Sequence, residues 1–504
     1  YPRITVTHSN RSCSRIGRGY RDGTCRMGHL VLIRNAEIDF GTRVDLRIAQ
    51  GRIAAINHSL APLSAEEVFD AQGGALLPGL HDHHVHLYAS AAARASVPCG
   101  PPQVRDAAAL SKNLRVAAAE LVAGGWLRGV GYHESVAGEI NRDWLDAVLP
   151  DRPVRIQHRS GRLWILNSCA LREISAESEM DAPLERVGER ATGRLYDGDA
   201  WLRGRMSGTR PSLHDISQQF ASYGVTSLTD TSHHNGAEEF AAFSSARACG
   251  ELLQNVRVMG DARLDDVTSI AGVTRGEHKF HLHDHALPEF DGLCADIKRS
   301  HHANRAVAFH CVTRTDLVFA LAALREAGSG PGDRIEHAAI VPPELMAEIR
   351  ALGLTVVTQP HFIAERGDAY LRDVAAEDQP WLYRLRGFLD AGVPLAGGSD
   401  APYGDPNPWA SMQAAVSRRS ESGAVIWRDE ALTPEQALAL FLSPLDAPAA
   451  VSRRVVVGAP ADLCLLATPW RDARMDLSKT QVRLTLKDGA EICRVEEGSI
   501  RSLR

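Results

Sequence analysis

The sequence predicts an α/β fold, an eight-stranded (β/α) barrel with a small β domain formed by both chain ends. Three observations lead to this prediction. Short apolar strands alternate with helical segments through the middle of the chain, eight such strands can be counted, and both ends contain strands without intervening helices. The 504 residues, of which 44% are hydrophobic, suffice for a large barrel core and a second domain.

The chain ends carry the pattern of short strands. Residues 29–39, 43–57 and 67–79 contain β-branched and aliphatic runs interrupted by Gly and Asn, and residues 453–469 and 481–500 repeat this pattern. We therefore expect residues 28–77 and 449–504 to pair into one small domain. Residues 1–27 hold six arginines and a single acid, which predicts a disordered or non-native extension outside the fold.

The barrel is predicted over residues 78–448. Its expected strands lie at 75–87, 153–159, 224–230, 278–285, 306–312, 333–340, 354–362 and 393–402. Amphipathic segments such as 316–328 and 342–353 separate them, each ending in Gly. Residues 91–223 are too numerous for simple loops, which predicts insertions around the barrel mouth.

Metal-ligand side chains stand at the ends of four predicted strands. His84 and His86 are two residues apart, so both can face the barrel axis, and His310, His337 and Asp400 end three other strands. The C-terminal strand ends of such a barrel meet at one face, where its chemistry is placed. Because His and Asp are preferred ligands of Zn, Mn and Fe(II), this pattern predicts a divalent metal site.

A lysine on the strand at 278–285 needs a separate explanation. Lys279 shares a strand face with His281 and His283, and an unpaired ammonium group inside a barrel is costly. The lysine is therefore either salt-bridged or present as a neutral, chemically modified amine. Carbon dioxide adds to a neutral amine to give a carbamate, an oxygen ligand that two metal ions would stabilise.

Together these motifs resemble the metal-dependent amidohydrolase superfamily, and more narrowly its YtcJ-like branch, which includes N-substituted formamide deformylases. The resemblance rests on HxH in PGLHDHHVH, the lysine of the fourth strand, single histidines on the fifth and sixth, and GSD on the eighth. GVTSLTD, GDRIEHA, GSDAPYGDPNPW and GAPADLCLL extend it over residues 30–466. It implies a TIM-like (β/α)8 barrel and a β-sandwich built from both chain ends.

The resemblance also implies a ligand set. His84 and His86 would bind the more buried metal together with Asp400, N6-carboxylated Lys279 would bridge, and His310 and His337 would hold a second metal. The expected metal is zinc, as one or two ions. The fourth strand is unusually rich in histidine, so His281 or His283 in place of the lysine, in a one-metal site, is the alternative.

A site of this kind predicts a hydrolase that cleaves a non-peptide, amide-type C–N bond of a small molecule. A bound metal lowers the pKa of water from 15.7 to about 7 and polarises a carbonyl oxygen. Asp400 would be the catalytic residue that takes the proton and passes it to the leaving nitrogen. The alternatives are a deaminase or an ester or phosphoester hydrolase on the same scaffold, or a non-catalytic regulator that retains the barrel.

Four further side chains are candidates for substrate binding, namely His361, Asp230, His158 and Arg162. His361 could polarise the substrate carbonyl or serve as a structural imidazole. Arg162 stands where many relatives have a histidine, and it could clamp a carboxylate or remain a solvated or salt-bridged arginine.

Composition excludes several other classes. The formal charge of -6 gives no basic excess for nucleic acid, and no apolar run approaches the roughly 20 residues of a membrane span. The nine cysteines form no CxxC pair, which predicts a cytoplasmic protein with reduced thiols. A small-molecule substrate is the expected partner, and a homodimer is the default oligomeric state.

Overall fold

The computed structural model describes residues 30–495, apart from residues 102, 123, 177, 178, 180, 181 and 207–209. The predicted extension at 1–27 lies outside the described residues, as do residues 496–504 of the predicted C-terminal strand segment. Among the residues that the structure describes, none of the helices combines the length and the apolar character that crossing a lipid bilayer requires.

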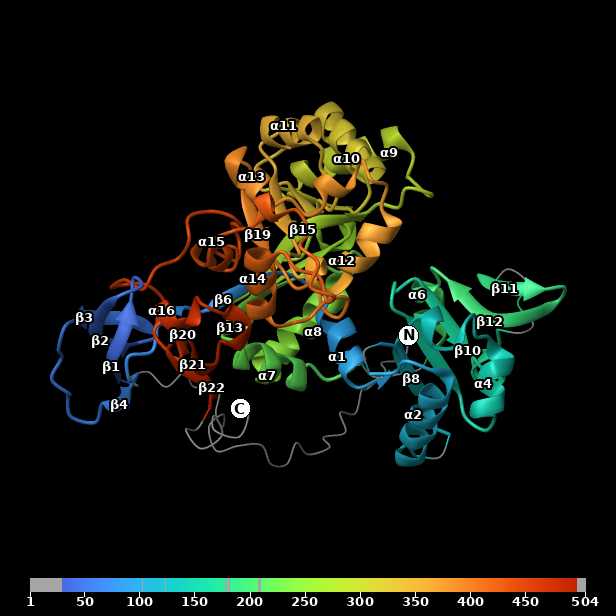
Figure 1. The fold of residues 1–504 in the computed structure, drawn as a ribbon, viewed down its shortest axis with the longest axis horizontal. Coiled ribbons are helices and arrows are strands. Elements are labelled where there is room, and N and C mark those ends of the chain that lie inside the picture. Colours follow the sequence, from blue (N-terminus) through green and yellow to red (C-terminus); the bar gives the residue numbers. More distant parts are fainter. Residues whose placement is uncertain are drawn as a thin grey trace, which may run out of the picture.

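Eight parallel strands form one sheet that closes into a barrel at the centre of the molecule (Figure 1). In order around the sheet they are β6 (Leu80–Val85), β13 (Val225–Asp230), β14 (Asn255–Gly260), β15 (Val273–His281), β16 (Val307–Cys311), β17 (Arg334–His337), β18 (Thr355–Thr358) and β19 (Leu395–Gly397). Closure occurs beside the predicted ligands, because the Asp400 amide donates to the His84 carbonyl at 2.7 Å and the His86 amide donates to the Ala401 carbonyl at 2.9 Å. The TIM-like barrel prediction is confirmed.

One strand was assigned to the wrong sheet. Residues 153–159 form β9 (Val154–His158), which pairs with strands of a separate sheet, and β14 occupies the third position of the barrel instead. Both segments are short and alternate apolar residues with arginine, so periodicity identifies each as a strand. The sheet that a strand joins is decided by its pairing partners, which a single sequence does not reveal.

Helices cover the outside of the barrel. They are α1 (Leu87–Arg94), α7 (His214–Ser222), α8 (Ala237–Ala248), α9 (Phe290–His302), α10 (Arg314–Ala327), α11 (Pro343–Ala351), α12 (Phe362–Asp373), α13 (Arg386–Asp390), α14 (Pro408–Ser417) and α15 (Pro434–Ala439). Short 3-10 helices lie at Ala262–Leu264, Gln379–Trp381, Arg428–Glu430 and Leu477–Lys479. The helix α10 illustrates why these segments form helices. Thr313 and Asp316 form a capping box at its start. Leu317, Leu321 and Leu324 lie on one face of the helix and are buried.

The predicted insertion is a folded unit with its own core. Its six-stranded sheet has the order β11 (Leu184–Val187), β12 (Arg190–Tyr196), β10 (Leu163–Leu166), β9, β8 (Leu127–Tyr132) and β7 (Val97–Pro98). The helices α2 (Ala107–Glu120), α3 (Glu134–Ala137), α4 (Arg142–Val148), α5 (Ser168–Glu173) and α6 (Asp199–Arg205) complete it. Leu110, Leu114 and Ile156 belong to a hydrophobic cluster separate from that of the barrel. The unit lies beside the barrel, next to α1 (Figure 1).

The two chain ends meet in a β-sandwich on the other side of the barrel (Figure 1). One sheet has the order β3 (Arg52–Asn57), β2 (Thr42–Ala49), β1 (Val31–Ile38) and β4 (Glu67–Asp70), and the other has the order β22 (Ala490–Arg494), β21 (Val482–Lys487), β20 (Leu463–Leu466) and β5 (Leu76–Pro78), with α16 (Trp470–Ala473) after β20. Ile33, Leu46, Leu465 and Leu484 are buried in one shared cluster. A small β domain from both ends is therefore present, whereas the residue limits predicted for the domains stay a prediction.

Candidate metal centre

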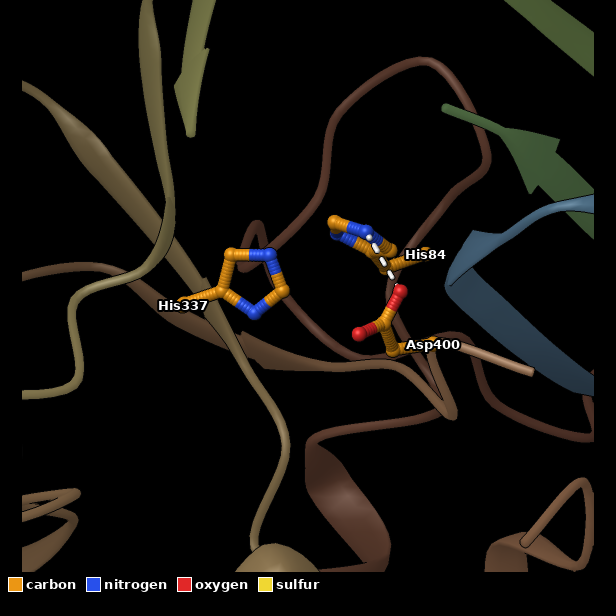
Figure 2. Close-up of side chains that lie close together, drawn as sticks. All are labelled: His84, His337 and Asp400. Atoms are coloured by element: carbon orange, nitrogen blue, oxygen red, sulfur yellow. Dashed lines mark ion pairs between the residues drawn. The ribbon is translucent and has the colours of Figure 1, made fainter. Parts of the chain in front are cut away.

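Three side chains that could hold a metal ion converge at the C-terminal end of the barrel (Figure 2). His84 comes from β6, His337 ends β17, and Asp400 follows β19. Their ligand atoms lie within 4.8 Å of one another, and all three residues are buried. The structure thus contains a His/His/Asp set of a kind that binds divalent metals.

The other three predicted ligands lie around this set. His86 Nε2 is 3.3 Å from Asp400 Oδ1, and the ring centres of His310 and His337 are 4.5 Å apart. Lys279 is buried on β15, where the charges of Glu336 and Asp400 act on its amine. The barrel therefore brings all six predicted ligands to one end, although they come from separate strands.

The hydrogen bonds of the imidazoles fit a metal-binding role. His84 Nδ1 lies 2.5 Å from a Glu336 carboxylate oxygen, and His337 Nδ1 lies 2.7 Å from the Gln359 amide oxygen. With Nδ1–H of His337 donated to Gln359, the lone pair of this ring remains on Nε2. His84 Nε2 faces Asp400 Oδ1 at 3.2 Å, and although burial lowers the pKa of His84, the charges of Glu336 and Asp400 outweigh burial and raise it. Metal-ligating histidines ordinarily make such second hydrogen bonds, which fix the tautomer and the ring orientation.

Burial and neighbouring charges set the protonation states of the other side chains at this centre. Burial lowers the pKa of His337 to about 3 and holds the pKa of His310 well below its usual range, so both imidazoles are neutral at neutral pH. Burial raises the pKa of Asp400, but the charge of His84 and hydrogen bonds from His84 and His86 outweigh this effect. The pKa of Asp400 therefore lies well below its usual range, and the residue is an anion.

The amine of Lys279 is buried without a partner. Its Nζ makes no hydrogen bond within the part of the chain that the structure describes. Burial lowers the pKa of Lys279 to about 8, against the opposing influence of the Glu336 charge. A substantial neutral fraction follows near pH 8, which is the form that reacts with carbon dioxide.

Comparison with known proteins identifies the family. The model of the amidohydrolase family matches residues 67–492, which is most of the chain. The chain belongs to the amidohydrolase family. This membership confirms the predicted family and the predicted enzyme class, a metal-dependent hydrolase of C–N bonds outside peptides.

Individual relatives agree with this membership. The amidohydrolase is 25% identical to N-substituted formamide deformylase of Arthrobacter pascens, with 88% of this chain and 93% of the relative covered. It is 20% identical to the protein YtcJ of Bacillus subtilis (strain 168), covering 74% and 80%. Among solved structures, an uncharacterized metal-dependent hydrolase from Pyrococcus horikoshii OT3 has the same fold, with a TM-score of 0.71, 18% identity, and 92% and 99% of the two chains covered.

Sequence reasoning missed the acid that supports His84, the first predicted ligand. Glu336 is fully buried, pairs with Arg334 at 2.5 Å and with His84 at 2.5 Å, and lies next to His337 on β17. The sequence did contain a signal for this pair. Arg334 and Glu336 are two residues apart in the short strand RIEH, so their opposite charges share one face of the strand.

The alternative ligand of the fourth strand also lies near the site. The ring of His281 is 4.3 Å from that of His310 and 4.4 Å from that of His283. Burial lowers the pKa of His281 to about 2, so the ring is neutral. The neutral ring of His281 therefore lies beside His310, one of the two histidines predicted to bind the second metal.

Two of the predicted substrate-binding residues are held by other parts of the barrel. His361 Nε2 donates to the Ser399 carbonyl at 2.9 Å, and its Nδ1 lies 3.1 Å from the Ser411 hydroxyl. Asp230 accepts a hydrogen bond from the Leu87 amide at 2.7 Å. These contacts position the strand ends around the centre, and a substrate contact of either residue stays a prediction.

The other two predicted substrate-binding residues lie on the insertion. His158 Nε2 is 3.2 Å from Glu134, whereas Arg162 makes a two-pronged ion pair with Asp197 at 2.8 and 2.6 Å. Arg162 also contacts the segment that follows β15, since its Nη2 lies 2.9 Å from His285 Nε2. Arg162 thus joins the insertion to the barrel mouth, and its substrate role stays a prediction.

Tyr403 is a second residue that sequence reasoning missed. It follows Asp400 by three residues, its amide donates to the Asp400 carbonyl at 2.8 Å, and its ring is 5.5 Å from that of His86. A Cβ at Gly161 of the insertion would lie 2.7 Å from the Tyr403 ring, so the insertion packs closely on this side chain. Tyr403 therefore stands between the metal centre and the insertion.

Proposed function

We propose that this amidohydrolase uses zinc, as one or two ions, to hydrolyse an amide-type C–N bond of a small molecule. His84, His86, Lys279, His310, His337 and Asp400 would hold the metal. The observation that supports this proposal most strongly is the buried His84–His337–Asp400 set, whose imidazoles are oriented by Glu336 and Gln359. Asp400 is ionised and His337 is neutral, which are the forms that bind metal, and a bound ion would replace the proton through which His84 Nε2 pairs with Asp400.

The protein's own groups would carry the proton through the reaction. When bound, the metal lowers the pKa of water and polarises a carbonyl oxygen. Asp400, ionised and held by His84 and His86 at 3.2 and 3.3 Å, accepts the proton of the attacking water and delivers it to the leaving nitrogen. The C–N bond breaks as the new C–O bond forms, giving a carboxylic acid and an amine.

Lys279 would act as a bridging ligand after carboxylation. Its neutral amine attacks carbon dioxide, an N–C bond forms, and one proton leaves the nitrogen, which gives a carbamate anion. The unpartnered, buried Nζ with a pKa of about 8 supports this assignment. In a one-metal site, His281, whose ring lies beside that of His310, or the neighbouring His283 would be the ligand instead.

The relative with 25% identity suggests where to look for the substrate. Because that protein is named for the deformylation of N-substituted formamides, formamides and other acyl derivatives of primary amines are the first compounds to test. The fold and metal by themselves do not select among them.

The proposal is tested by metal analysis combined with hydrolysis assays on a panel of N-formyl, N-acyl and cyclic amides. We expect one or two equivalents of zinc and metal-dependent turnover of at least one panel member. Asp400→Asn should reduce kcat about 100-fold or more, as expected for loss of a general acid–base group. Asp472→Asn, on the surface helix α16, is the matched control and should retain wild-type turnover. Full activity of metal-free protein, or wild-type turnover of Asp400→Asn, would contradict the proposal.

A further inference from the structure

Two arginines of the insertion lie side by side. Arg128 on β8 is directly opposite Arg155 on β9 in the parallel register. Within the described part of the chain, neither guanidinium forms an ion pair. Both side chains are only partly exposed, so water screens the two like charges less than it would on an open surface.

The hydrogen-bond partners of the two arginines are neutral. Arg128 donates to the Ser96 hydroxyl at 2.7 Å and to the Gln157 amide oxygen at 3.1 Å. Arg155 Nη1 lies 2.7 Å from the sulfur of Met206, and its buried Nε has no partner. Since a guanidinium carries five N–H donors, this pair retains donors for a further acceptor.

One tryptophan holds both guanidinium groups. The guanidinium carbons of Arg128 and Arg155 lie 5.2 and 5.1 Å from the centre of the Trp164 ring. Trp164 is itself fixed, because it is buried and its indole N–H donates to Asp199 at 2.9 Å. Contact with the aromatic face stabilises each cation and restricts its rotation, which prepares the pair to receive a ligand.

The charges of the pair are only partly compensated by the protein, because the nearby charge of Asp199 raises the pKa of each arginine but does not outweigh burial. Burial lowers the pKa of both arginines to about 10, and the charge of Arg155 contributes to the lowering at Arg128. Two like charges in a partly buried position are mutually destabilising, and a bound anion would relieve that repulsion.

Arg128 of the pair lies near Tyr403, the residue that stands beside the metal centre. The charges of Arg128 and Asp400 both act on the phenol of Tyr403, whose ring contacts His86. Tyr403 therefore lies near both the metal centre and Arg128 of the pair.

We propose that Arg128 and Arg155 form an anion-binding site that holds a carboxylate group of the substrate while the scissile amide lies at the metal centre. A carboxylate is planar and matches the fork of a guanidinium through two parallel N–H···O bonds. The substrates would thus be acyl or formyl amides that carry a carboxylate elsewhere in the molecule. The identification of this ligand as substrate rests on the proposed function, whereas carboxylate binding by the pair does not.

The test uses benzoate as the probe and isothermal titration calorimetry on the full-length protein. We expect benzoate to bind the wild-type protein and its neutral isostere benzamide to bind at least about tenfold more weakly. Arg128→Met and Arg155→Met should each weaken benzoate binding about tenfold or more. Arg155→Lys keeps the charge but loses the planar fork, and should also weaken it severalfold. Arg471→Met removes a side chain that is 80% exposed on α16, and should bind benzoate like the wild type.

Several results would overturn the proposal. These are wild-type affinity for benzoate in Arg128→Met, equal binding of benzamide and benzoate, absence of benzoate binding to the wild type, and tighter binding of inorganic phosphate than of benzoate. Thermal unfolding curves show whether each variant folds, and if Arg155→Met does not, then Arg128→Met and Arg155→Lys decide.

The two proposals fail separately. Benzoate binding that depends on the arginines but occurs in a protein without metal-dependent hydrolysis would overturn the proposed function alone. Metal-dependent hydrolysis in a protein whose benzoate affinity is the same in the arginine variants would overturn only the anion site.

Discussion

Among single residues, Glu336 supports the candidate metal centre through its contact with His84. It accepts from His84 Nδ1 and from Arg334, and all three side chains are buried. The carboxylate therefore fixes the ring of one ligand and neutralises a buried guanidinium. Its loss should affect both metal affinity and folding.

We predict that Glu336→Gln lowers metal affinity about 10- to 100-fold, as is typical when the hydrogen-bond partner of a metal-binding histidine is removed. It should also destabilise the protein by about 3–5 kcal/mol, because Arg334 loses its buried counter-ion. Competition with a chromogenic chelator measures the affinity. The control is Glu348→Gln, which removes a surface partner of Arg325 on α11. Unchanged metal affinity in Glu336→Gln would show that the carboxylate does not support His84.

The pH dependence of stability tests whether His361 is a structural imidazole. Burial lowers its pKa from 6.5 to about 4, so as the pH falls below 6.5 the unfolded chain binds a proton that the folded protein does not. The stabilisation is therefore complete above pH 6.5 and is lost progressively down to about pH 4. We predict that His361→Gln makes the fall in unfolding free energy over this window smaller by about 3 kcal/mol. Urea unfolding at a series of pH values measures it, and identical slopes for both proteins would refute the role.

On the scale of secondary-structure elements, the close contact between β6 and the segment after β19 leaves no room for a side chain at position 398. A Cβ at Gly398 would lie 2.5 Å from the Cβ of His84 and 2.6 Å from its amide nitrogen. The glycine lets the last barrel strand approach the first closely enough for Asp400 to reach His84. Any larger residue must move the backbone that carries a predicted ligand.

We therefore expect Gly398→Ala to destabilise the protein by about 1–3 kcal/mol and to reduce its metal content. Gly41→Ala is the control, because nothing lies within 4 Å of a Cβ at that position and its backbone does not require glycine. Differential scanning calorimetry and metal analysis of both variants measure the effect. A Gly398→Ala protein with normal metal content would mean that the closure is less tight than the structure indicates.

The arrangement of the barrel strands also explains which parts of the site could be predicted from the sequence. Parallel strands place their C-terminal ends together, so a histidine or aspartate at each strand end was enough to predict that these side chains lie close together, whereas their role as ligands stays a prediction. The approach of Glu336 to the same site was harder to predict, because adjacent strand residues normally face opposite sides. His337 has a φ of 67°, which ends β17 and breaks this alternation, and nothing in the sequence marks it.

Long-range pairing was the other feature that the sequence could not supply. The strand β9 was predicted in the barrel, yet it pairs with β8 and β10, while β14 pairs with β13 and β15. Strand propensity is a local property and sheet membership is not. The partners of His361 and Asp230 depend on the same distant contacts.

On the scale of the whole molecule, a metal ion bound at the proposed site would join side chains from several barrel strands and should stabilise the closed barrel. An ion that binds the folded but not the unfolded chain adds about 2.7 kcal/mol when its free concentration is 100 times Kd. We predict that removal of metal by EDTA lowers the unfolding temperature by several degrees and that added zinc restores it. In Asp400→Asn, removal of metal should lower the unfolding temperature by less than in the wild type. Equal unfolding temperatures of the wild type with and without metal would argue against the site.

The molecule as a whole combines a barrel that holds the chemistry, a sandwich that joins its two ends and an insertion that reaches the barrel mouth through Arg162 and the Gly161–Tyr403 contact. The central claim is that His84, His337 and Asp400 surround a metal ion. Anomalous diffraction recorded on either side of the zinc absorption edge, from crystals of the active protein, tests it most directly. We predict a strong anomalous peak bounded by these three side chains. A crystal of hydrolytically active protein with no peak at this position would contradict the account.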